Sequence, residues 1–377
     1  MCLFDAMVPM AVSLVLELRA LGNTDLIQMY HCNGELSPSS QRIIYMMDAH
    51  VQIIDGCVAM VEAGILSSGQ ANDFRSFWIK PLALVHTHLD DVVLIDADDL
   101  VFQDVALLWD VPEYKETGTI FFYDREIPKH QYLQNDFTVN GEVMSNLKAL
   151  YHTFDYESLG LKKTRPSDHL IQSLAWAGDT AHEQDSSIVV INKTKAPKAM
   201  EVLWRLVTQD RYRIGFSYGD KELFWLAYEL AHTPYFFSMW ANTGAARPGN
   251  MKEHPDTLCG GLAQWMPIPS SESVLLHING GYIFNPYVDH DIASLKNVEE
   301  RLNQLLADMP THVSKRRKRS KALIKPEDPD NFWPQECLYK RGSEAIRPAD
   351  IESIKRRIHN AMMIAKIQIR ERKLDGI

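Results

Sequence analysis

The sequence predicts an α/β fold in which helices flank a mixed central sheet. Stretches with helical spacing of apolar residues alternate along the chain with short apolar runs typical of strands. The chain has 377 residues, of which 46% are hydrophobic, enough for one large domain or two ordinary ones. One short run, residues 92–95, is followed at once by Asp96, Ala97, Asp98 and Asp99.

The elements are expected in the following order. Residues 8–21 carry dense apolar residues at helical spacing and end near Gly22, and residues 26–30 indicate a strand. We then expect a helix at 78–88, strands at 92–95, 118–123 and 186–191, helices at 197–208 and 221–231, and a strand at 273–278.

The character of the chain changes after Pro310. Residues 315–321 are a basic run, residues 326–334 are rich in turn formers, and residues 348–373 have the pattern of one long cationic helix. We therefore predict three parts: a main body at 1–310, a basic, Pro-containing linker at 311–347 and a C-terminal helix at 348–377.

Charge is unevenly distributed. The net charge is -10, yet from Thr311 onward 17 Lys and Arg face 9 Asp and Glu. An acidic body argues against a nucleic-acid groove, which needs positive potential along the phosphates. The basic run at 315–319 is either a solvated linker, which we favour, or a contact to an anionic membrane surface.

Cysteine spacing and hydropathy do not indicate a cellular compartment for the protein. The five cysteines lie apart without a Cys-x-x-Cys pair, which indicates neither a zinc cluster nor a dense disulfide framework, and the redox compartment stays open. No apolar stretch approaches the roughly 20 residues of a membrane span. The first residues lack the basic start of a signal peptide.

The acidic run after residues 92–95 is the leading candidate site. Ligands of α/β proteins bind at the carboxyl ends of buried strands, and carboxylates gathered there repel one another unless a cation lies among them. Oxygen ligands suit Mg²⁺ or Mn²⁺, which commonly arrive with phosphates. The alternative is an ordinary acidic turn, in which Asp caps a helix or forms an Asx turn.

Other polar residues stand at the ends of predicted elements. Lys80 lies on the helix before the acidic strand, polar residues at 182–186 precede a strand, and residues 218–222 precede a helix. His277 lies in an apolar strand followed by Gly280 and Gly281. Each has a simpler interpretation: a solvated lysine, helix-capping turns and a hydrogen-bonded core histidine.

Taken as an ordered series, these residues resemble the Golgi α-1,3-mannosyltransferase family. The resemblance rests on Asp96-Ala97-Asp98 and on residues 118–125, 183–193 and 219–225, and it covers residues 26–286. The chain is similar, more distantly, to glycogenin-type glycosyltransferases. The resemblance implies a GT-A fold over 1–310 that moves mannose from GDP-mannose to a glycan or glycoprotein hydroxyl with retention, in the Golgi.

The resemblance also implies roles for individual residues. It makes Asp96, Asp98 and His277 ligands of Mn²⁺ (or Mg²⁺). It places Lys80, Asp96, Ser186 and Gly280 against the nucleotide-sugar donor. It gives Asp185 and Asp220 the catalytic side of the site, where they position the sugar.

Two departures and two competing functions remain. Family members begin with an apolar strand that binds the nucleotide, and residues 1–8 are too few for that strand and its loop, so we expect the strand to be lacking. The family's N-terminal membrane anchor is not seen in this sequence either.

A haloacid-dehalogenase-type phosphatase would use Asp96 as nucleophile, although Leu100 stands where those enzymes have Thr or Val. A non-catalytic carbohydrate-binding relative is the other alternative.

Overall fold

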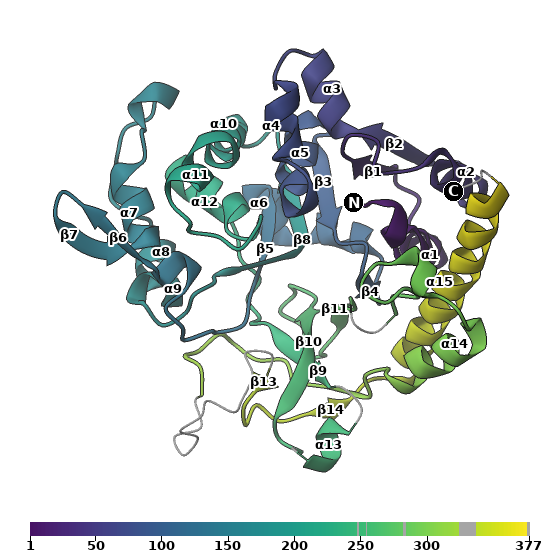
Figure 1. Cartoon of the computed structure of the whole chain (residues 1–377). Coiled ribbons are helices and arrows are strands. Elements are labelled where there is room, and N and C mark those ends of the chain that lie inside the picture. The colour runs from purple at the N-terminus through teal and green to yellow at the C-terminus, as the bar shows by residue number, and fades with distance from the viewer. Residues whose placement is uncertain (247–248, 254, 282–283, 324–336, 375–377) are drawn as a thin grey trace.

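The computed structural model describes residues 1–246, 249–253, 255–281, 284–323 and 337–374. The predicted α/β class is confirmed, and Figure 1 shows helices around a group of sheets. The central sheet has three strands in the order β3-β8-β5, and both pairings are antiparallel. Its strands are β3 (Asp91–Ile95), β8 (Gln184–Asn192) and β5 (Thr119–Tyr123).

A second sheet lies next to the central one and continues into the C-terminal part. Its order is β14-β12-β9-β10-β11-β4, and β13 also pairs with β10. The strands are β4 (Asp99–Val101), β9 (Thr243–Ala246), β10 (Leu258–Trp265), β11 (Leu275–Asn279), β12 (His312–Val313), β13 (Cys337–Leu338) and β14 (Glu344–Ala345). Residues 311–347, predicted as a linker, thus contribute strands to a sheet.

Two smaller strand pairs complete the β structure of the described residues. The strands β1 (Ile27–His31) and β2 (Val51–Asp55) pair in parallel, and β6 (Asp136–Val139) and β7 (Glu142–Ser145) form a hairpin. Beside β1, the amide of Leu3 donates to the carbonyl of Tyr30 and the amide of Tyr30 donates to that of Met1, both at 2.9 Å. A hollow of about 290 Å³ separates β1 from β3.

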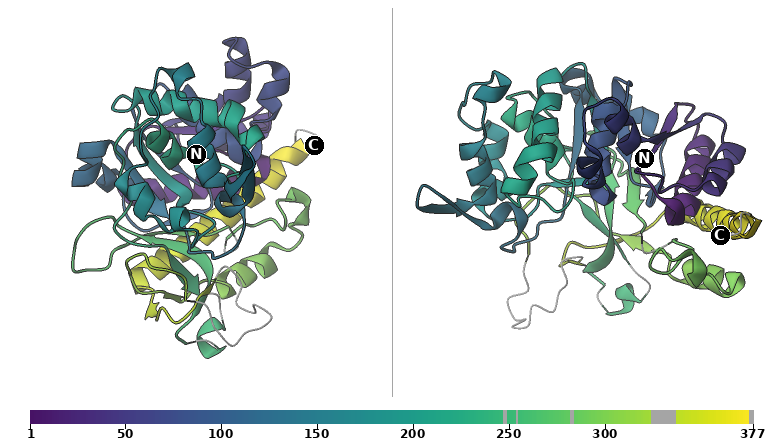
Figure 2. Two further views of the ribbon diagram at one scale, coloured as in Figure 1. Left: turned by 90° about the vertical axis from the view of Figure 1, so that its left-hand side faces the viewer. Right: turned by 45° about the horizontal axis from the view of Figure 1, so that its top comes forward.

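Helices cover the sheets. They are α1 (Val8–Ala20), α2 (Pro38–Met47), α3 (Gly56–Glu62), α4 (Ser68–Asn72), α5 (Ile79–His86), α6 (Pro112–Thr117), α7 (Asn146–Thr153), α8 (Asp168–Gln172), α9 (Leu174–Ala177), α10 (Pro197–Arg205), α11 (Arg211–Arg213), α12 (Leu223–Leu230), α13 (Asn250–Glu253), α14 (Val298–Ala307) and α15 (Pro348–Leu374). Every residue of α12 is buried, so its apolar sequence reflects a core position. Figures 1 and 2 show α15 running alongside α1 and α14.

Two disulfides join distant parts of the chain. Cys32, directly after β1, is bonded to Cys57 on α3, and Cys259 on β10 is bonded to Cys337 on β13. The spacing of the cysteines did not predict these pairs, because each bond joins residues that only the fold brings together. Cys2 is free. Within the part of the chain that the structure describes, no helix is both long enough and apolar enough to cross a bilayer.

Candidate functional site

The residues after β3 form a tight turn, here called the acid turn (residues 96–99). The amide of Asp96 donates to the carbonyl of Ser187 on β8 at 2.9 Å, and the amide of Asp99 donates to the carbonyl of Asp96 at 3.1 Å. Asp99 opens β4, which pairs with β11 of the second sheet. The acid turn therefore lies where the chain passes from the central sheet to the second sheet, and it carries three carboxylates.

Lys80 on α5 joins the acid turn to a second part of the chain. Its ammonium nitrogen lies 2.7 Å from Asp96 and 3.3 Å from Asp220, and it donates to the carbonyl of Ser186 at 2.9 Å. Lys80 is 8% exposed. Burial alone would lower the pKa of Lys80, but Asp220 and Asp96 outweigh it and raise this pKa above its ordinary value. Four predicted site residues thus meet at one buried ammonium group.

Asp220 reaches this position through a turn that needs glycine. Gly219 has a φ of +62°, and a Cβ there would lie 2.8 Å from the side chain of Phe77. The turn directs Asp220, which is 2% exposed, toward Lys80. Glycine is needed before Asp220 because this position has a left-handed backbone conformation and lies in tight contact with Phe77.

The three carboxyl groups of the acid turn resist ionisation. Burial raises the pKa of Asp96 to about 7, with Lys80 opposing and Asp98 and Asp220 adding to the rise. Burial also raises the pKa of Asp98, and it raises that of Asp99 far more, helped by the charges of Asp96 and Asp98. Both side-chain oxygens of Asp99 are buried without a hydrogen-bond partner. If all three were ionised, the turn would carry more negative charge than Lys80 balances.

The glycine pair after β11 lets the chain approach the acid turn. The amide of Gly280 donates to the carbonyl of Asp98 at 2.8 Å. A Cβ on Gly280 would lie 2.7 Å from that carbonyl oxygen, and one on Gly281 would lie 2.6 Å from a side-chain oxygen of Asp98. The structure thus places Gly280 against the acid turn itself, as a backbone contact.

His277 lies in a different network. Its Nε2 is 2.9 Å from the hydroxyl of Ser187, which donates to Asp185 at 2.9 Å, and Asp185 also accepts from Gln264 at 2.8 Å. The ring packs edge-on against Phe122 and is fully buried. Burial lowers the pKa of His277 to about 4. The structure therefore gives His277 and Asp185 the hydrogen-bonded core role that was the simpler interpretation for the histidine.

The predicted metal set is only partly reproduced. Among the described residues, no group of three or more His, Cys, Asp and Glu is placed to hold an ion, so His277 does not join Asp96 and Asp98 as a third ligand. The unpartnered oxygens of Asp99 and the raised pKa values of its neighbours nevertheless suit a hard divalent cation at the acid turn. Asp96 and Asp98 are the acids of the turn that would contribute oxygen ligands to such an ion, as two of the several that it needs.

Sequence reasoning did not predict a second buried network, which lies where β5 ends and β8 begins. His182 lies 3.1 Å from Glu222, which accepts from the indole of Trp225 at 2.7 Å, and Lys221 forms an ion pair with Asp124. Lys221 and Glu222 follow Asp220 directly, so the segment 218–222 that the sequence singled out carries these groups as well. Their partners His182 and Asp124 lie in the segments 182–186 and 118–125, which the sequence also singled out, but the pairing between these distant segments was not predicted.

The basic run is also part of this region. Arg317 holds Glu126 through two hydrogen bonds of 2.8 and 2.6 Å, Arg319 lies 3.4 Å from Glu183 and stacks on a tyrosine, and Arg316 stacks on Trp240. The interpretations of a solvated linker and of a membrane contact are therefore wrong for these three arginines. Buried carboxylates need paired cations, and the run supplies them.

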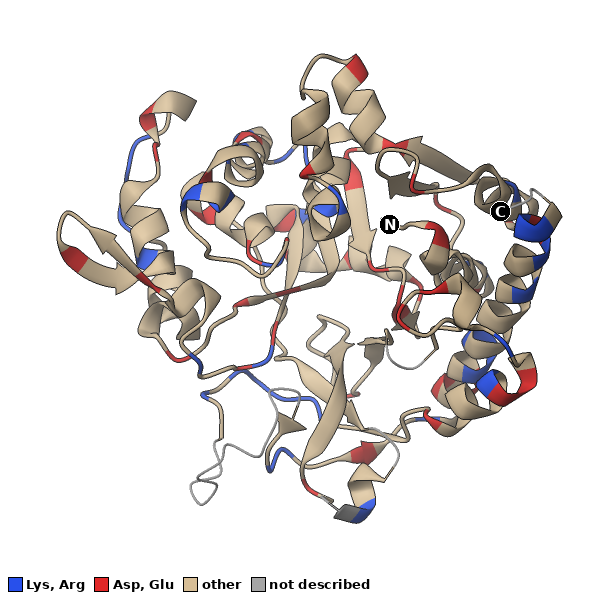
Figure 3. Ribbon diagram, in the orientation of Figure 1, with Lys and Arg blue, Asp and Glu red and all other residues tan. Residues whose placement is uncertain are grey.

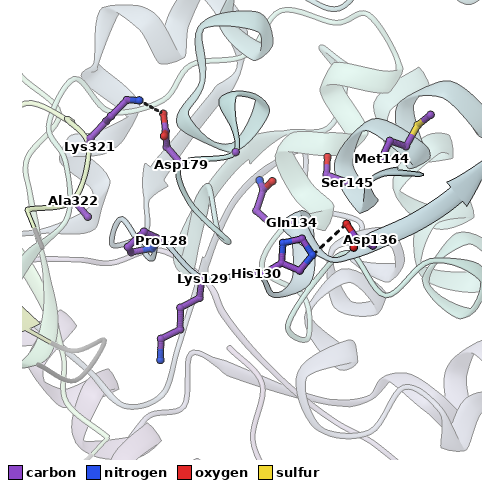
Figure 4. Close-up of a pocket in the computed structure, with 11 residues that line it drawn as sticks. Pro128, Lys129, His130, Gln134, Asp136, Met144, Ser145, Asp179, Lys321 and Ala322 are labelled. Atoms are coloured by element: carbon purple, nitrogen blue, oxygen red, sulfur yellow. Dashed lines mark ion pairs between the residues drawn. The ribbon is translucent and has the colours of Figure 1, made fainter. Parts of the chain in front are cut away.

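Another hollow, of about 600 Å³, opens beside the β6–β7 hairpin (Figure 4). Two ion pairs line it, His130 with Asp136 at 3.2 Å and Lys321 with Asp179 at 2.9 Å. The first pair is about two-thirds exposed, so water screens it. This hollow contains none of the predicted site residues, and we assign the candidate site to the acid turn instead.

Charge on the whole molecule agrees with that assignment. Figure 3 shows Asp and Glu at the acid turn and many Lys and Arg along α15.

The fold and the site together define an α/β protein with a carboxylate-lined site where a buried strand of its central sheet ends. The chain belongs to the family described as "Mannosyltransferase putative", whose model matches residues 3–264.

Curated relatives from two yeasts are similar to the chain. The alpha-1,3-mannosyltransferase MNT2 of Saccharomyces cerevisiae is 22% identical over 288 residues, which are 74% of this chain and 50% of that protein. The alpha-1,3-mannosyltransferase MNT3 of the same yeast is 25% identical over 230 residues, 58% of this chain and 36% of that protein. The chain spans half or less of the length of these relatives.

A solved structure of a galactosyltransferase is also similar to the chain, more weakly. The galactosyltransferase LgtC, in complex with donor and acceptor sugar analogues, is 12% identical, with a TM-score of 0.37. The match covers 81% of this chain and 93% of that one.

Proposed function

We propose that this chain is the catalytic domain of a GT-A glycosyltransferase that moves mannose from GDP-mannose to a glycan or glycoprotein hydroxyl, forming an α-1,3 linkage with retention. The cluster of Lys80, Asp96 and Asp220 beside Asp98 is the observation that carries the proposal. Membership of the mannosyltransferase family supports glycosyl transfer over the phosphatase alternative. The names of the yeast relatives support mannose and the α-1,3 linkage.

The chemical problem is negative charge on the departing diphosphate. A divalent ion, Mn²⁺ or Mg²⁺, would supply positive charge to phosphate oxygens when bound, and Asp96 and Asp98 would contribute two of its ligands. The ammonium group of Lys80 lies next to these acids, at 2.7 Å from Asp96. In this proposal Lys80 exchanges part of its contact with Asp96 for the donor's phosphates.

The sugar side of the site falls to residues beyond Lys80. Asp220 is held by Lys80 and is a hydrogen-bond acceptor for sugar hydroxyls, and the Ser186 backbone is fixed by the same ammonium. Asp185 is committed to Ser187 and Gln264, so it positions the start of β8. The acceptor hydroxyl would lose its proton to the leaving phosphate, since the carboxylates of Asp96 and Asp220 are already engaged by Lys80.

Calorimetric titration of GDP-mannose, with and without Mn²⁺, tests this function. We expect donor binding that depends on Mn²⁺, and Asp98→Asn should weaken it at least 100-fold because one carboxylate ligand is lost. The matched control is Asp110→Asn, which changes an Asp whose side chain is 78% exposed. UDP-glucose and UDP-galactose complete the panel.

Equal affinity of both variants for the donor would exclude the acid turn as the donor site. Binding of GDP-mannose without any Mn²⁺-dependent release of mannose would favour the non-catalytic carbohydrate-binding alternative. Tighter binding of a UDP-sugar would retain the site and change the donor.

We also propose a location in the Golgi lumen, by family. The two disulfides support an oxidising compartment of the secretory pathway, since such bonds are rare in the cytosol. Fluorescence microscopy of the tagged full-length protein tests the location, and a cytosolic signal would contradict it.

A further inference from the structure

The C-terminal helix α15 sends one cation into the interior behind the candidate site. Arg357 is 1% exposed although it is one of three consecutive basic residues, whereas Lys355 pairs with the exposed Glu352 and the half-exposed Arg356 pairs with the buried Glu17 of α1. A buried guanidinium costs several kcal/mol unless it is well paired. The partners of Arg357 therefore show what this cation does.

The guanidinium of Arg357 holds the backbone on which the acid turn ends. It donates to the carbonyl of Asp99 at 2.9 Å and to the carbonyl of Met10 on α1 at 3.3 Å. Its planar face stacks on Phe284 at 4.6 Å, and Phe284 also touches the position where Gly280 would carry a Cβ. One side chain thus fixes β4, α1 and the segment after β11 relative to one another.

Arg357 is also the positive charge behind the carboxylates. The charges of Asp98 and Asp99 act on Arg357, and the charge of Arg357 acts in turn on the carboxyl group of Asp98. Lys80 approaches the acid turn from α5, so the two cations come from different elements. Lys80 touches the carboxylate of Asp96 directly, whereas Arg357 contacts the backbone of the acid turn.

The same helix also holds two other segments of the chain. Gln368 donates to the carbonyl of Asp5 at 2.8 Å and accepts from the hydroxyl of Tyr287 at 2.8 Å, and Arg372 lies 3.0 Å from the carboxylate of Asp5. The family model ends at residue 264, so α15 lies outside the matched region. The contacts to Asp5 therefore join α15 to the part of the chain that the family model matches.

We propose that Arg357 is a positioning residue, through which α15 sets the geometry of the acid turn for cation and donor binding. The proposal rests on the proposed function in its second half, the binding of a cation. Its first half, the ordering of residues 96–101 by Arg357, concerns the protein alone.

Arg357→Lys is the informative variant, because it keeps the positive charge and removes the planar group that spans two carbonyls and a ring. Arg370→Lys, on the exposed face of the same helix, is the matched control. Both variants are studied as the full chain. Hydrogen exchange by mass spectrometry measures peptides over 96–101, and electron paramagnetic resonance measures binding of Mn²⁺ alone.

We expect faster exchange at residues 96–101 in Arg357→Lys, with unchanged exchange in α12, and about 10- to 100-fold weaker Mn²⁺ binding. Arg370→Lys should match the wild type in both measurements. Equal exchange at 96–101 in the two variants would overturn the positioning role. A wild type that binds no Mn²⁺ would overturn the metal dependence of the proposed function, while the exchange result would still decide whether Arg357 orders the turn.

Discussion

Burial decides the chemistry of His277. Its imidazole donates a single hydrogen bond from Nε2 to the Ser187 hydroxyl, which itself donates to Asp185, and the ring is fully buried, so the neutral ring is favoured. A histidine before a glycine pair is equally compatible with a metal ligand and with a core residue, and the sequence could not separate them. The deciding quantity, solvent exposure of the ring, belongs to the folded chain.

The lowered pKa of His277 predicts a loss of stability in acid. Because the unfolded chain binds a proton near pH 6.5 and the folded chain only near pH 4, folding becomes less favourable as the pH falls between these values. From pH 7.5 to pH 5 this residue should remove about 2 kcal/mol of unfolding free energy. Urea unfolding of the wild type and of His277→Gln measures it.

The variant should lose less stability over that interval than the wild type, by about the same 2 kcal/mol. His50→Gln, at an exposed position, should keep the wild-type pH dependence. A His277→Gln variant with the pH dependence of the wild type would mean that the ring is charged in the folded protein.

Among the elements, those with a strong apolar period were predictable. The sequence located α1, α5, α10, α12 and α15 and the strands β1, β3, β5, β8 and β11 within a few residues of their bounds, because each is long or densely apolar. The sequence missed β9 and β10. Their sequences contain three glycines and several alanines, and such small residues leave no alternation to detect.

The site was predictable to a similar extent. Lys80, Asp96, Ser186 and Asp220 do meet, and each lies near the start or the end of a recognisable element. The contribution of α15 was not predictable. Which one of three adjacent cations turns inward depends on the position of α15 on α1, about 340 residues away in sequence.

At the level of elements, the contact between β11 and the acid turn predicts an unequal response to alanine. Gly280→Ala should lower the free energy of unfolding by about 2 kcal/mol, since the new methyl group would overlap the carbonyl of Asp98 and the ring of Phe284. Gly69→Ala, in α4 with open space around it, should raise stability by up to about 1 kcal/mol.

Chemical denaturation of the two variants measures both effects. A Gly280→Ala protein as stable as the wild type would show that β11 can move away from the acid turn without cost.

For the whole molecule, the two disulfides predict a loss of stability when one bond is removed and a defined number of free thiols. The bond between Cys259 and Cys337 closes a loop of 78 residues, and the one between Cys32 and Cys57 closes a loop of 25. Removing the longer one, in Cys259→Ser with Cys337→Ser, should lower the unfolding free energy by about 2–5 kcal/mol.

Mass spectrometry after alkylation in denaturant checks the pairing directly. The untreated protein should take up one alkyl group, at Cys2, and the reduced protein should take up five. More than one label without reduction would contradict the two bonds.

The place of the acid turn between two sheets has a consequence for cooperativity. A ligand bound by Asp96 and Asp98 engages the end of β3 on one side and, through the β4–β11 pairing, the second sheet on the other. The central sheet and the second sheet can then not unfold separately while the ligand stays bound. Saturation with ligand should merge the melting of the two sheets into one sharper transition.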